Sequence, residues 1–293
     1  MSGHSSIPKV ALNDGTAIPQ IGFGTLAVQP DREPSPSNTE RTAEIVGLAL
    51  QAGYRHIDTA QSYGNERGVG RAIAASGIPR EELYVTSKLA NSNHRSDDVR
   101  HSFDETLKNL GLDQLDLFLI HWPLPTLYDG DYVSTWKVIT ELVAQGRLRT
   151  AGVSNFQPAH LDRIIAETGI VPAVNQMELH PYLSNQAVRA AAARDGIAVE
   201  AHSPLGHNGK PLDDETITQI AASREKSSAQ VILRWHLQHG HIVIPKSALR
   251  ERMEENLNVI NFDLSEQEIK SIDALDKGES GRAGPNPDTY EGI

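Results

Sequence analysis

The sequence predicts an α/β fold, a (β/α)₈ TIM barrel with an N-terminal β-hairpin and a C-terminal loop. Eight short apolar runs alternate with segments of helical spacing, which favours a parallel sheet with helical crossovers. No linker divides the 293 residues, a length typical of one barrel domain over 1–293. The competing open, doubly wound sheet would carry G-x-G-x-x-G after its first strand, but Gly22 and Gly24 lead into Leu26 instead.

The elements follow in order along the chain. Residues 10–18 predict a hairpin, because Asp14-Gly15 between apolar runs is a two-residue turn signal. The Pro- and Ser-rich stretch 29–39 predicts a mobile loop, and the Gly- and Pro-rich tail 278–293 predicts a wrapping loop. Ser265 and Glu268 form a capping box for a late helix. The eight expected strands are 21–24, 55–58, 83–88, 115–120, 150–153, 173–176, 197–201 and 242–245.

Helical spacing between the strands defines faces that should pack on the sheet. Such faces are Val99, Phe103, Leu107 and Leu110; Leu161, Ile164 and Ile165; and Ala229, Ile232, Leu233 and Leu237.

Composition and charge exclude several classes of protein. Apolar residues make up 39% and charged residues 22%, as in ordinary globular proteins, and no apolar run approaches the ~20 residues of a membrane span. The net charge of −11 and the lack of a basic run argue against nucleic-acid binding. The absence of cysteine excludes thiolate chemistry, and the first residues lack a signal-peptide core. We therefore expect a cytoplasmic protein. We also expect it to be a monomer that acts on a small molecule.

A metal site is not expected. His236, His239 and His241 lie close together in the sequence, but no H-E-x-x-H pattern or suitably spaced carboxylate accompanies them. We expect His236 to pack against a helix face instead.

Polar residues end the expected strands at the edge where barrels carry their active sites. Strand ends are often polar, so one such residue means little, but the whole set indicates a site. The set is Asp58, Lys88, His121, Ser154, Asn155, Gln176, His202, Ser203, Lys246 and Ser247.

Five segments around these residues carry a family resemblance. They are GYRHIDTAQSYGNERGVG at 53–70, LIHWP at 119–123, GVSNF at 152–156, NQMELHPY at 175–182 and IPKS at 244–247. In this order and spacing they resemble the aldo-keto reductases, most of all the prokaryotic branch containing 2,5-diketo-D-gluconate reductases. The resemblance implies an NADPH-dependent oxidoreductase that reduces small aldehydes, ketones or dicarbonyls to alcohols by hydride transfer.

The resemblance also implies a catalytic tetrad of Asp58, Tyr63, Lys88 and His121. Hydride addition to a carbonyl leaves an alkoxide that must be protonated, and a tyrosine with a pKa near ~10 is by itself a poor acid. The Lys88 ammonium should lower the pKa of Tyr63, with Asp58 as the counter-ion of Lys88. His121, as neutral imidazole, would orient the substrate oxygen while Tyr63 acts as general acid.

A cofactor phosphate should bind where Lys246, Ser247 and Arg252 surround the start of the helix after the last strand. A helix N-terminus with nearby cations suits the 2′-phosphate of NADP(H), although an ordinary basic helix start is the alternative. The remaining cofactor contacts are implied by the resemblance: Glu255 and Asn256 at the adenine, Ser154, Asn155 and Gln176 at the carboxamide, Ser203 and Leu205 at the pyrophosphate, and Gly24 and Thr25 after the first strand.

The chain departs from its relatives at two positions near the expected pocket. His202 stands where most relatives stack an aromatic ring on the nicotinamide, and Ala90 stands where many have Trp. Trp122, together with Tyr63 and His121, is the expected substrate contact. A redox-silent module that only holds NADP(H) is the second function considered, and the complete tetrad favours the reductase.

Overall fold

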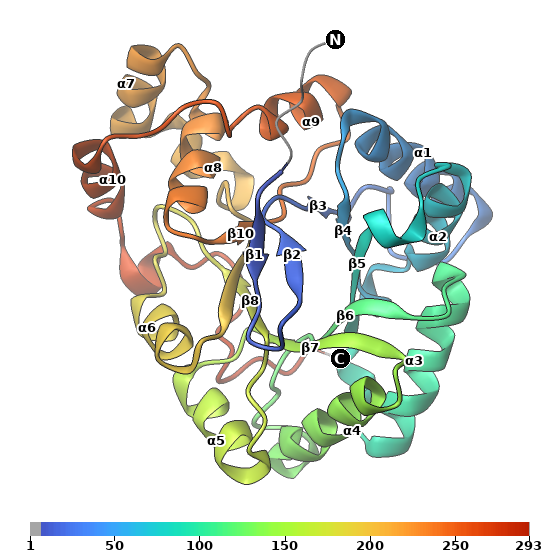
Figure 1. The fold of residues 1–293 in the computed structure, drawn as a ribbon. Helices are drawn as coiled ribbons and strands as arrows, with labels where there is room; N and C mark the ends of the chain where they lie inside the picture. Colours follow the sequence, from blue (N-terminus) through green and yellow to red (C-terminus); the bar gives the residue numbers. More distant parts are fainter. Residues whose placement is uncertain (1–6, 293) are drawn as a thin grey trace.

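Eight parallel strands form the centre of the computed structural model, which describes residues 7–292 except the side chains of His207 and Asn208. Neighbours in sequence pair throughout, and a parallel bridge from Ile21 to Val243 joins the first strand to the last. The sheet therefore closes into the predicted barrel (Figure 1). The strands are β3 (Phe23–Gly24), β4 (His56–Asp58), β5 (Tyr84–Leu89), β6 (Leu115–Ile120), β7 (Leu148–Ser154), β8 (Val174–Glu178), β9 (Ala198–His202) and β10 (Ile242–Val243).

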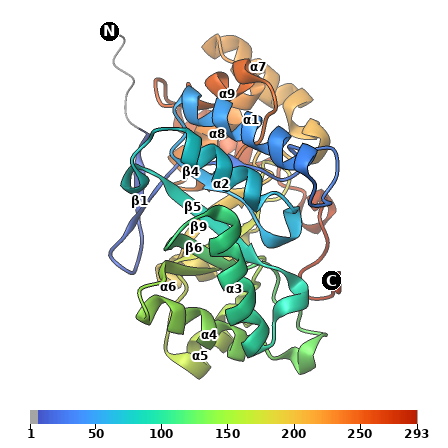
Figure 2. The same cartoon turned by 90° about the vertical axis from the view of Figure 1, so that its right-hand side faces the viewer.

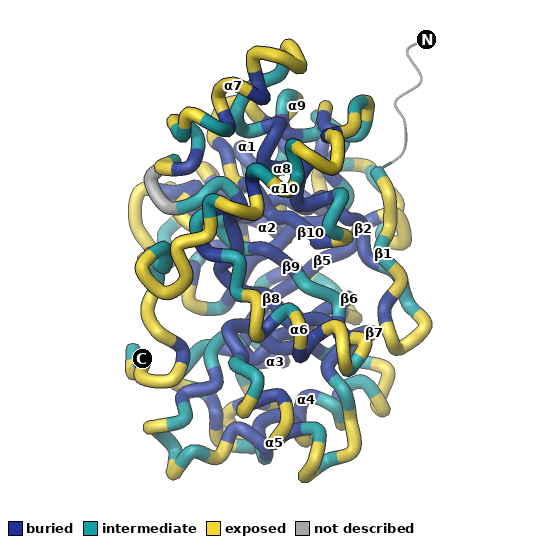
Figure 3. The backbone as a smooth tube through the Cα atoms, turned by 90° about the vertical axis from the view of Figure 1, so that its left-hand side faces the viewer, coloured by how far each residue is buried: buried dark blue, intermediate teal, exposed yellow. Residues whose placement is uncertain are grey.

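Helices surround the barrel on all sides (Figure 1). Their inner faces are buried and their outer turns exposed, as the burial colours show (Figure 3). The predicted apolar faces are buried except Ile165 and Ala229, which are half-buried, and the capping box at Ser265 and Glu268 is present. The helices are α1 (Pro36–Ala52), α2 (Glu66–Ala75), α3 (Ser96–Leu110), α4 (Tyr132–Ala144), α5 (Pro158–Thr168), α6 (Gln186–Asp195), α7 (Glu215–Arg224), α8 (Ser228–Gln238), α9 (Arg250–Leu257) and α10 (Glu266–Asp273).

The N-terminal hairpin of β1 (Lys9–Ala11) and β2 (Ala17–Pro19) covers the amino-terminal end of the barrel. Its Leu12 and Ile18 pack with inward residues of the strands. The side view places the hairpin and the C-terminus at opposite ends of the barrel (Figure 2). The turn differs from the two-residue prediction: the Gly15 N–H donates to the Leu12 carbonyl at 3.1 Å, and Gly15 has φ 82°. A turn followed by a left-handed glycine is the longer type of hairpin loop.

The predicted loop 29–39 ends earlier than expected, because helix α1 starts at Pro36. The Ser35 hydroxyl accepts from the Asn38 N–H at 3.1 Å and caps the helix, while proline fits its first turn. The prediction was therefore wrong for 36–39. Three strand predictions also needed correction: β3 contains only the last two residues of 21–24, β10 contains only the first two of 242–245, and β7 extends beyond 150–153 at both ends.

The C-terminal tail crosses the carboxyl end of the barrel, as its loop prediction implied, after the 3₁₀ turn η6 (Gly278–Gly281). The two carboxylate oxygens of Glu178 accept from the N–H groups of Ala283 and Gly284, each at 2.9 Å. Farther along, the Tyr290 ring packs on Trp122 with centroids 4.4 Å apart. The tail is thus anchored at two points; Ile293 lies outside the described residues.

Candidate active site

A buried ion pair lies where β4 and β5 end. Asp58 and Lys88 are 1% and 0% exposed, and the Lys88 Nζ donates to Asp58 Oδ1 at 2.6 Å. Lys88 also donates to the Thr59 carbonyl at 3.0 Å and to the Tyr63 hydroxyl at 3.2 Å. Burial alone would lower the pKa of Lys88, but the charges and hydrogen bonds of Asp58 and Tyr63 outweigh it and raise that pKa. Lys88 therefore stays an ammonium.

Tyr63 reaches this pair from the 3₁₀ turn η1 (Gln61–Tyr63), which follows β4. The next residue, Gly64, has φ 69°, and a side chain there would collide with the Arg32 carbonyl of the preceding loop. Gln29 of that loop donates to the Tyr63 carbonyl at 2.7 Å. The Tyr63 ring is 7% exposed. The turn and the loop thus hold the hydroxyl over the ion pair.

The pKa of Tyr63 corrects one expectation. Burial raises this pKa, and the Lys88 ammonium lowers it by less, so the pKa lies above its ordinary value rather than below it. The sequence shows that Lys88 is present, but it does not show how deeply Tyr63 is buried. The hydroxyl consequently carries its proton at neutral pH and can donate it.

His121 completes the predicted group of four. Its ring lies edge-on to Tyr63, with centroids 5.8 Å apart and an interplanar angle of 72°. Burial, followed by the charge of Lys88, lowers the pKa of His121 well below its usual value. The imidazole is therefore neutral, as the sequence analysis expected.

The side-chain amide of Gln176 contacts this group through Asp58. Its Nε2 donates to Asp58 Oδ2 at 3.0 Å and to Glu200 Oε2 at 2.9 Å. Both N–H bonds are used, so only the amide oxygen remains for another partner. Glu200 was not predicted because it lies inside a strand rather than at its end, although the alternation of inward residues along β9 could have revealed it.

His202 is tied to Asn155, which was also predicted at the site. Asn155 donates through Nδ2 to the His121 carbonyl at 3.0 Å and to Ser154 Oγ at 3.1 Å. Its Oδ1 is therefore the acceptor for His202 Nε2, 3.1 Å away. Burial lowers the pKa of His202 to about 4, so the ring is neutral and donates through Nε2.

Two predicted cations lie at the exit of β10. Lys246 and Arg252 are exposed, and within residues 7–292 neither forms an ion pair, whereas Arg250 pairs with Glu254 at 2.8 Å. The Ser247 hydroxyl accepts from the Leu249 N–H at 3.0 Å, just before α9 begins. Free cations beside a helix start fit an anionic group.

The other predicted cofactor residues spread between these two places. Thr25 donates to the Asp58 carbonyl at 2.9 Å, and a side chain at Gly24 would come within 2.8 Å of the Ile244 carbonyl. These residues therefore connect the tetrad to the exit of β10. Ser203 and Leu205 follow β9, Glu255 accepts from the Ser227 hydroxyl, and Asn256 is buried.

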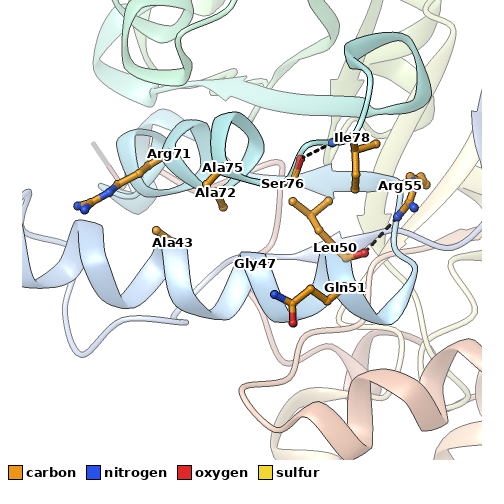
Figure 4. Close-up of a pocket in the computed structure, with 10 residues that line it drawn as sticks. All are labelled: Ala43, Gly47, Leu50, Gln51, Arg55, Arg71, Ala72, Ala75, Ser76 and Ile78. Atoms are coloured by element: carbon orange, nitrogen blue, oxygen red, sulfur yellow. Dashed lines mark hydrogen bonds between the residues drawn. The ribbon is translucent and has the colours of Figure 1, made fainter.

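Among the hollows of the structure, two lie outside the barrel, and neither is lined by Asp58, Tyr63, Lys88 or His121. One, of about 450 Å³, lies between the packed helices α1 and α2 (Figure 4). The other, of about 640 Å³, lies beside α6 and β9.

In the part of the chain that the structure describes, no cluster of three metal-ligating side chains occurs. The Nδ1 atom of His236 lies 3.3 Å from Nδ1 of His241, and its Nε2 atom lies 3.1 Å from the Pro204 carbonyl oxygen. No described helix is long and apolar enough to cross a membrane.

Comparison with known proteins identifies the family. The model of the aldo/keto reductase family matches residues 20–277. An aldo-keto reductase of Mycolicibacterium smegmatis is 50% identical over 97% of this chain and 98% of its own length. A glyoxal reductase of Bacillus subtilis is 44% identical over 95% and 96%. The crystal structure of a Bombyx mori aldo-keto reductase in complex with NADP is 38% identical, with a TM-score of 0.84 over 93% and 94%.

The chain belongs to the aldo-keto reductase family. It is therefore an NADP(H)-dependent oxidoreductase that acts on carbonyl groups. Its place in the diketo-gluconate reductase branch stays a prediction.

Proposed function

We propose that this enzyme reduces small aldehydes, ketones and dicarbonyls with Tyr63 as general acid. The observation that carries the proposal is the Lys88 ammonium, which contacts both Asp58 Oδ1 and the Tyr63 hydroxyl in a buried cluster. The similarity to a glyoxal reductase supports a small dicarbonyl as substrate. Trp122, half-buried at the carboxyl end of the barrel, is the proposed wall of the substrate pocket with Tyr63 and His121.

The chemistry divides between cofactor and protein. Bound NADPH supplies a hydride to the carbonyl carbon. His121, neutral, orients the carbonyl oxygen, and Tyr63 gives that oxygen its proton, so that the alkoxide becomes an alcohol. Lys88 stabilises the phenolate left on Tyr63, and Asp58 keeps Lys88 charged. Hydride and proton together balance the reduction.

The residues present fit NADP(H). Lys246 and Arg252 are exposed cations without an ion-pair partner in the described structure, which suits a 2′-phosphate, and Ser247 lies between them. The free amide oxygen of Gln176 suits the N–H₂ of a carboxamide. We therefore propose that these residues, with Ser154, Asn155, His202, Ser203 and Leu205, hold the cofactor.

A kinetic screen tests the function. Loss of NADPH absorbance is followed with a panel of glyoxal-like dicarbonyls, simple aldehydes and ketones. We expect turnover with dicarbonyls, and no turnover in Tyr63→Phe despite unchanged NADPH binding. An enzyme that binds NADPH tightly but reduces no member of the panel would instead be the redox-silent binding module.

We further propose that the protein is a monomer. Over its described surface, the large apolar side chains that are exposed are Leu26, Ile170 and Leu249, which lie in three different loops. Stable oligomers usually bury a contiguous apolar patch, which these three residues do not provide. Light scattering during gel filtration measures the mass, and a concentration-independent dimer mass would contradict the proposal.

A further inference from the structure

Glu200 is a buried carboxyl that the proposed chemistry does not use. It lies in β9 between the inward residues Ala198 and His202 and is 0% exposed. Its Oε2 accepts from Gln176, whereas its Oε1 has no hydrogen-bond partner among the described residues. The His56 Nε2 lies 3.7 Å from that oxygen. A group this deeply buried is normally well partnered, so its position calls for an explanation.

The cluster around Glu200 holds two carboxyls but one cation. Gln176 bridges Asp58 and Glu200, and Lys88 is bonded to Asp58 rather than to Glu200. Burial lowers the pKa of His56 to about 3, so His56 is neutral. A second buried carboxylate without a counter-ion would be costly. One proton on Glu200 therefore balances the charges of the cluster.

The residues around Glu200 support the assignment of one proton to its carboxyl group. His56 and Asp58 face it from β4, Tyr84 and Lys88 from β5, and Gln176 from β8. On the remaining neighbour, β10, its pairing partner is the apolar Ile242. Burial, then the charge of Asp58, raises the pKa of Glu200 to about 8.

We propose that Glu200 is a positioning residue for the tetrad: its neutral carboxyl fixes the Gln176 amide against Asp58, and its ionisation weakens the acid function of Tyr63. The inference rests on the proposed function. With one acceptor for each N–H, the Gln176 amide cannot turn over. A second negative charge beside Asp58 would favour the ammonium of Lys88 and disfavour phenolate on Tyr63, making the tyrosine a weaker acid.

The pH profile of kcat/KM distinguishes positioning from a general structural role. Glu200→Gln keeps a carbonyl acceptor for Gln176 but cannot ionise, so we expect activity within about threefold of wild type near neutral pH. Wild-type kcat/KM should fall as pH rises through about 8, and this step should be absent in Glu200→Gln. Glu200→Met, of similar size but without an acceptor, should be slower at every pH, by about tenfold. An identical descending limb in Glu200→Gln and wild type would overturn the proposal.

Thermal unfolding gives a readout that does not need activity. The pKa of Glu200 is higher in the folded than in the unfolded chain, so its contribution to stability is full below the unfolded pKa of ~4.3 and is lost as pH rises towards about 8. The Tm of Glu200→Gln should therefore gain on wild type between about pH 5 and pH 8. A gap that stays constant over this range would show that Glu200 is ionised throughout and would overturn the proposal.

Failure of the two proposals can be told apart. If Tyr63→Phe keeps its turnover, the proposed acid is wrong whatever Glu200 does. Tyr63→Phe could instead be inactive while Glu200→Gln has the same descending limb of kcat/KM as wild type and a constant difference in Tm. In that case only the role of Glu200 is wrong.

Discussion

Removal of the Tyr63 hydroxyl tests the mechanism most directly. General acid catalysis typically contributes ~10²–10⁴-fold, about 2.7–5.5 kcal/mol of barrier, so turnover of Tyr63→Phe should fall by that factor. The fold should tolerate the change. Lys88 keeps its bonds to Asp58 Oδ1 at 2.6 Å and to the Thr59 carbonyl at 3.0 Å, so no buried charge loses its partner. We expect a loss of about 1 kcal/mol in the free energy of unfolding, that of one ordinary hydrogen bond.

The assay compares single-turnover NADPH oxidation in wild type and variant, with NADPH binding measured separately. A deuteride isotope effect establishes that the chemical step is being observed. If Tyr63→Phe retained more than about a tenth of wild-type turnover under these conditions, Tyr63 would not be the acid.

Lys88→Met should lower turnover because Tyr63 loses its charged neighbour, and it should also lower the stability of the fold. The variant leaves Asp58, 1% exposed, without its cation, and an uncompensated buried charge costs about 3–5 kcal/mol of stability. Its Tm must therefore be measured beside its rate. Among folded molecules, the double variant with Tyr63→Phe should be about as slow as the slower single one, because both remove one acid function. Fully multiplicative losses would contradict this shared role.

Three further perturbations address the cofactor and the tail. Arg252→Ala should weaken NADPH by about 2–4 kcal/mol and leave NADH nearly unchanged, and equal losses in titrations with both would speak against a phosphate contact. His202→Tyr adds stacking surface but loses the donor to Asn155; each is worth about 1 kcal/mol, so the Kd for NADPH, from fluorescence quenching, should change less than threefold. Tightening beyond tenfold would show that the lost bond matters little. Burial would raise the pKa of Glu178, but hydrogen bonds from His180 and the tail lower it to about 2. The ionised carboxylate stabilises the folded chain by about 3 kcal/mol above the unfolded pKa of ~4.3, an effect that His180 and the tail N–H groups share, and this stabilisation is lost as pH falls towards 2. Glu178→Gln should therefore speed proteolysis of the tail at neutral pH, and unchanged cleavage would refute the anchor.

Much of the fold could be predicted because each strand and each helix buries an apolar face. This burial leaves a periodic pattern of apolar residues in the sequence, from which the alternation of strands and helices can be read. The start of α1 was missed because Ser35 and Pro36 suit both a loop and a helix N-terminus. The short β3 and β10 depend on how the barrel closes, where single bonds such as Gly24 N–H to the Pro245 carbonyl, at 3.2 Å, replace a long ladder. Closure is a property of the whole sheet, so local sequence does not reveal it.

The proximity of the four residues in the proposed tetrad could be predicted because each of them follows or ends a strand within a recognisable motif. Their electrostatics could not, since the pKa of Tyr63 depends on burial that only the assembled barrel provides. Glu200 was hidden by its place inside a strand. The contact of Glu178 with Ala283 joins residues 105 positions apart, a separation that no local pattern covers.

The way Glu178 holds the tail has a consequence for how such an enzyme diversifies. Its carboxylate binds the backbone N–H groups of Ala283 and Gly284, and every residue other than proline offers the same donor. The anchor therefore makes little demand on side-chain identity, whereas Tyr290, which lies on Trp122, can be exchanged without disturbing it. Substitutions among the tail side chains can therefore change the surface beside Trp122 without altering the backbone contacts that anchor the tail.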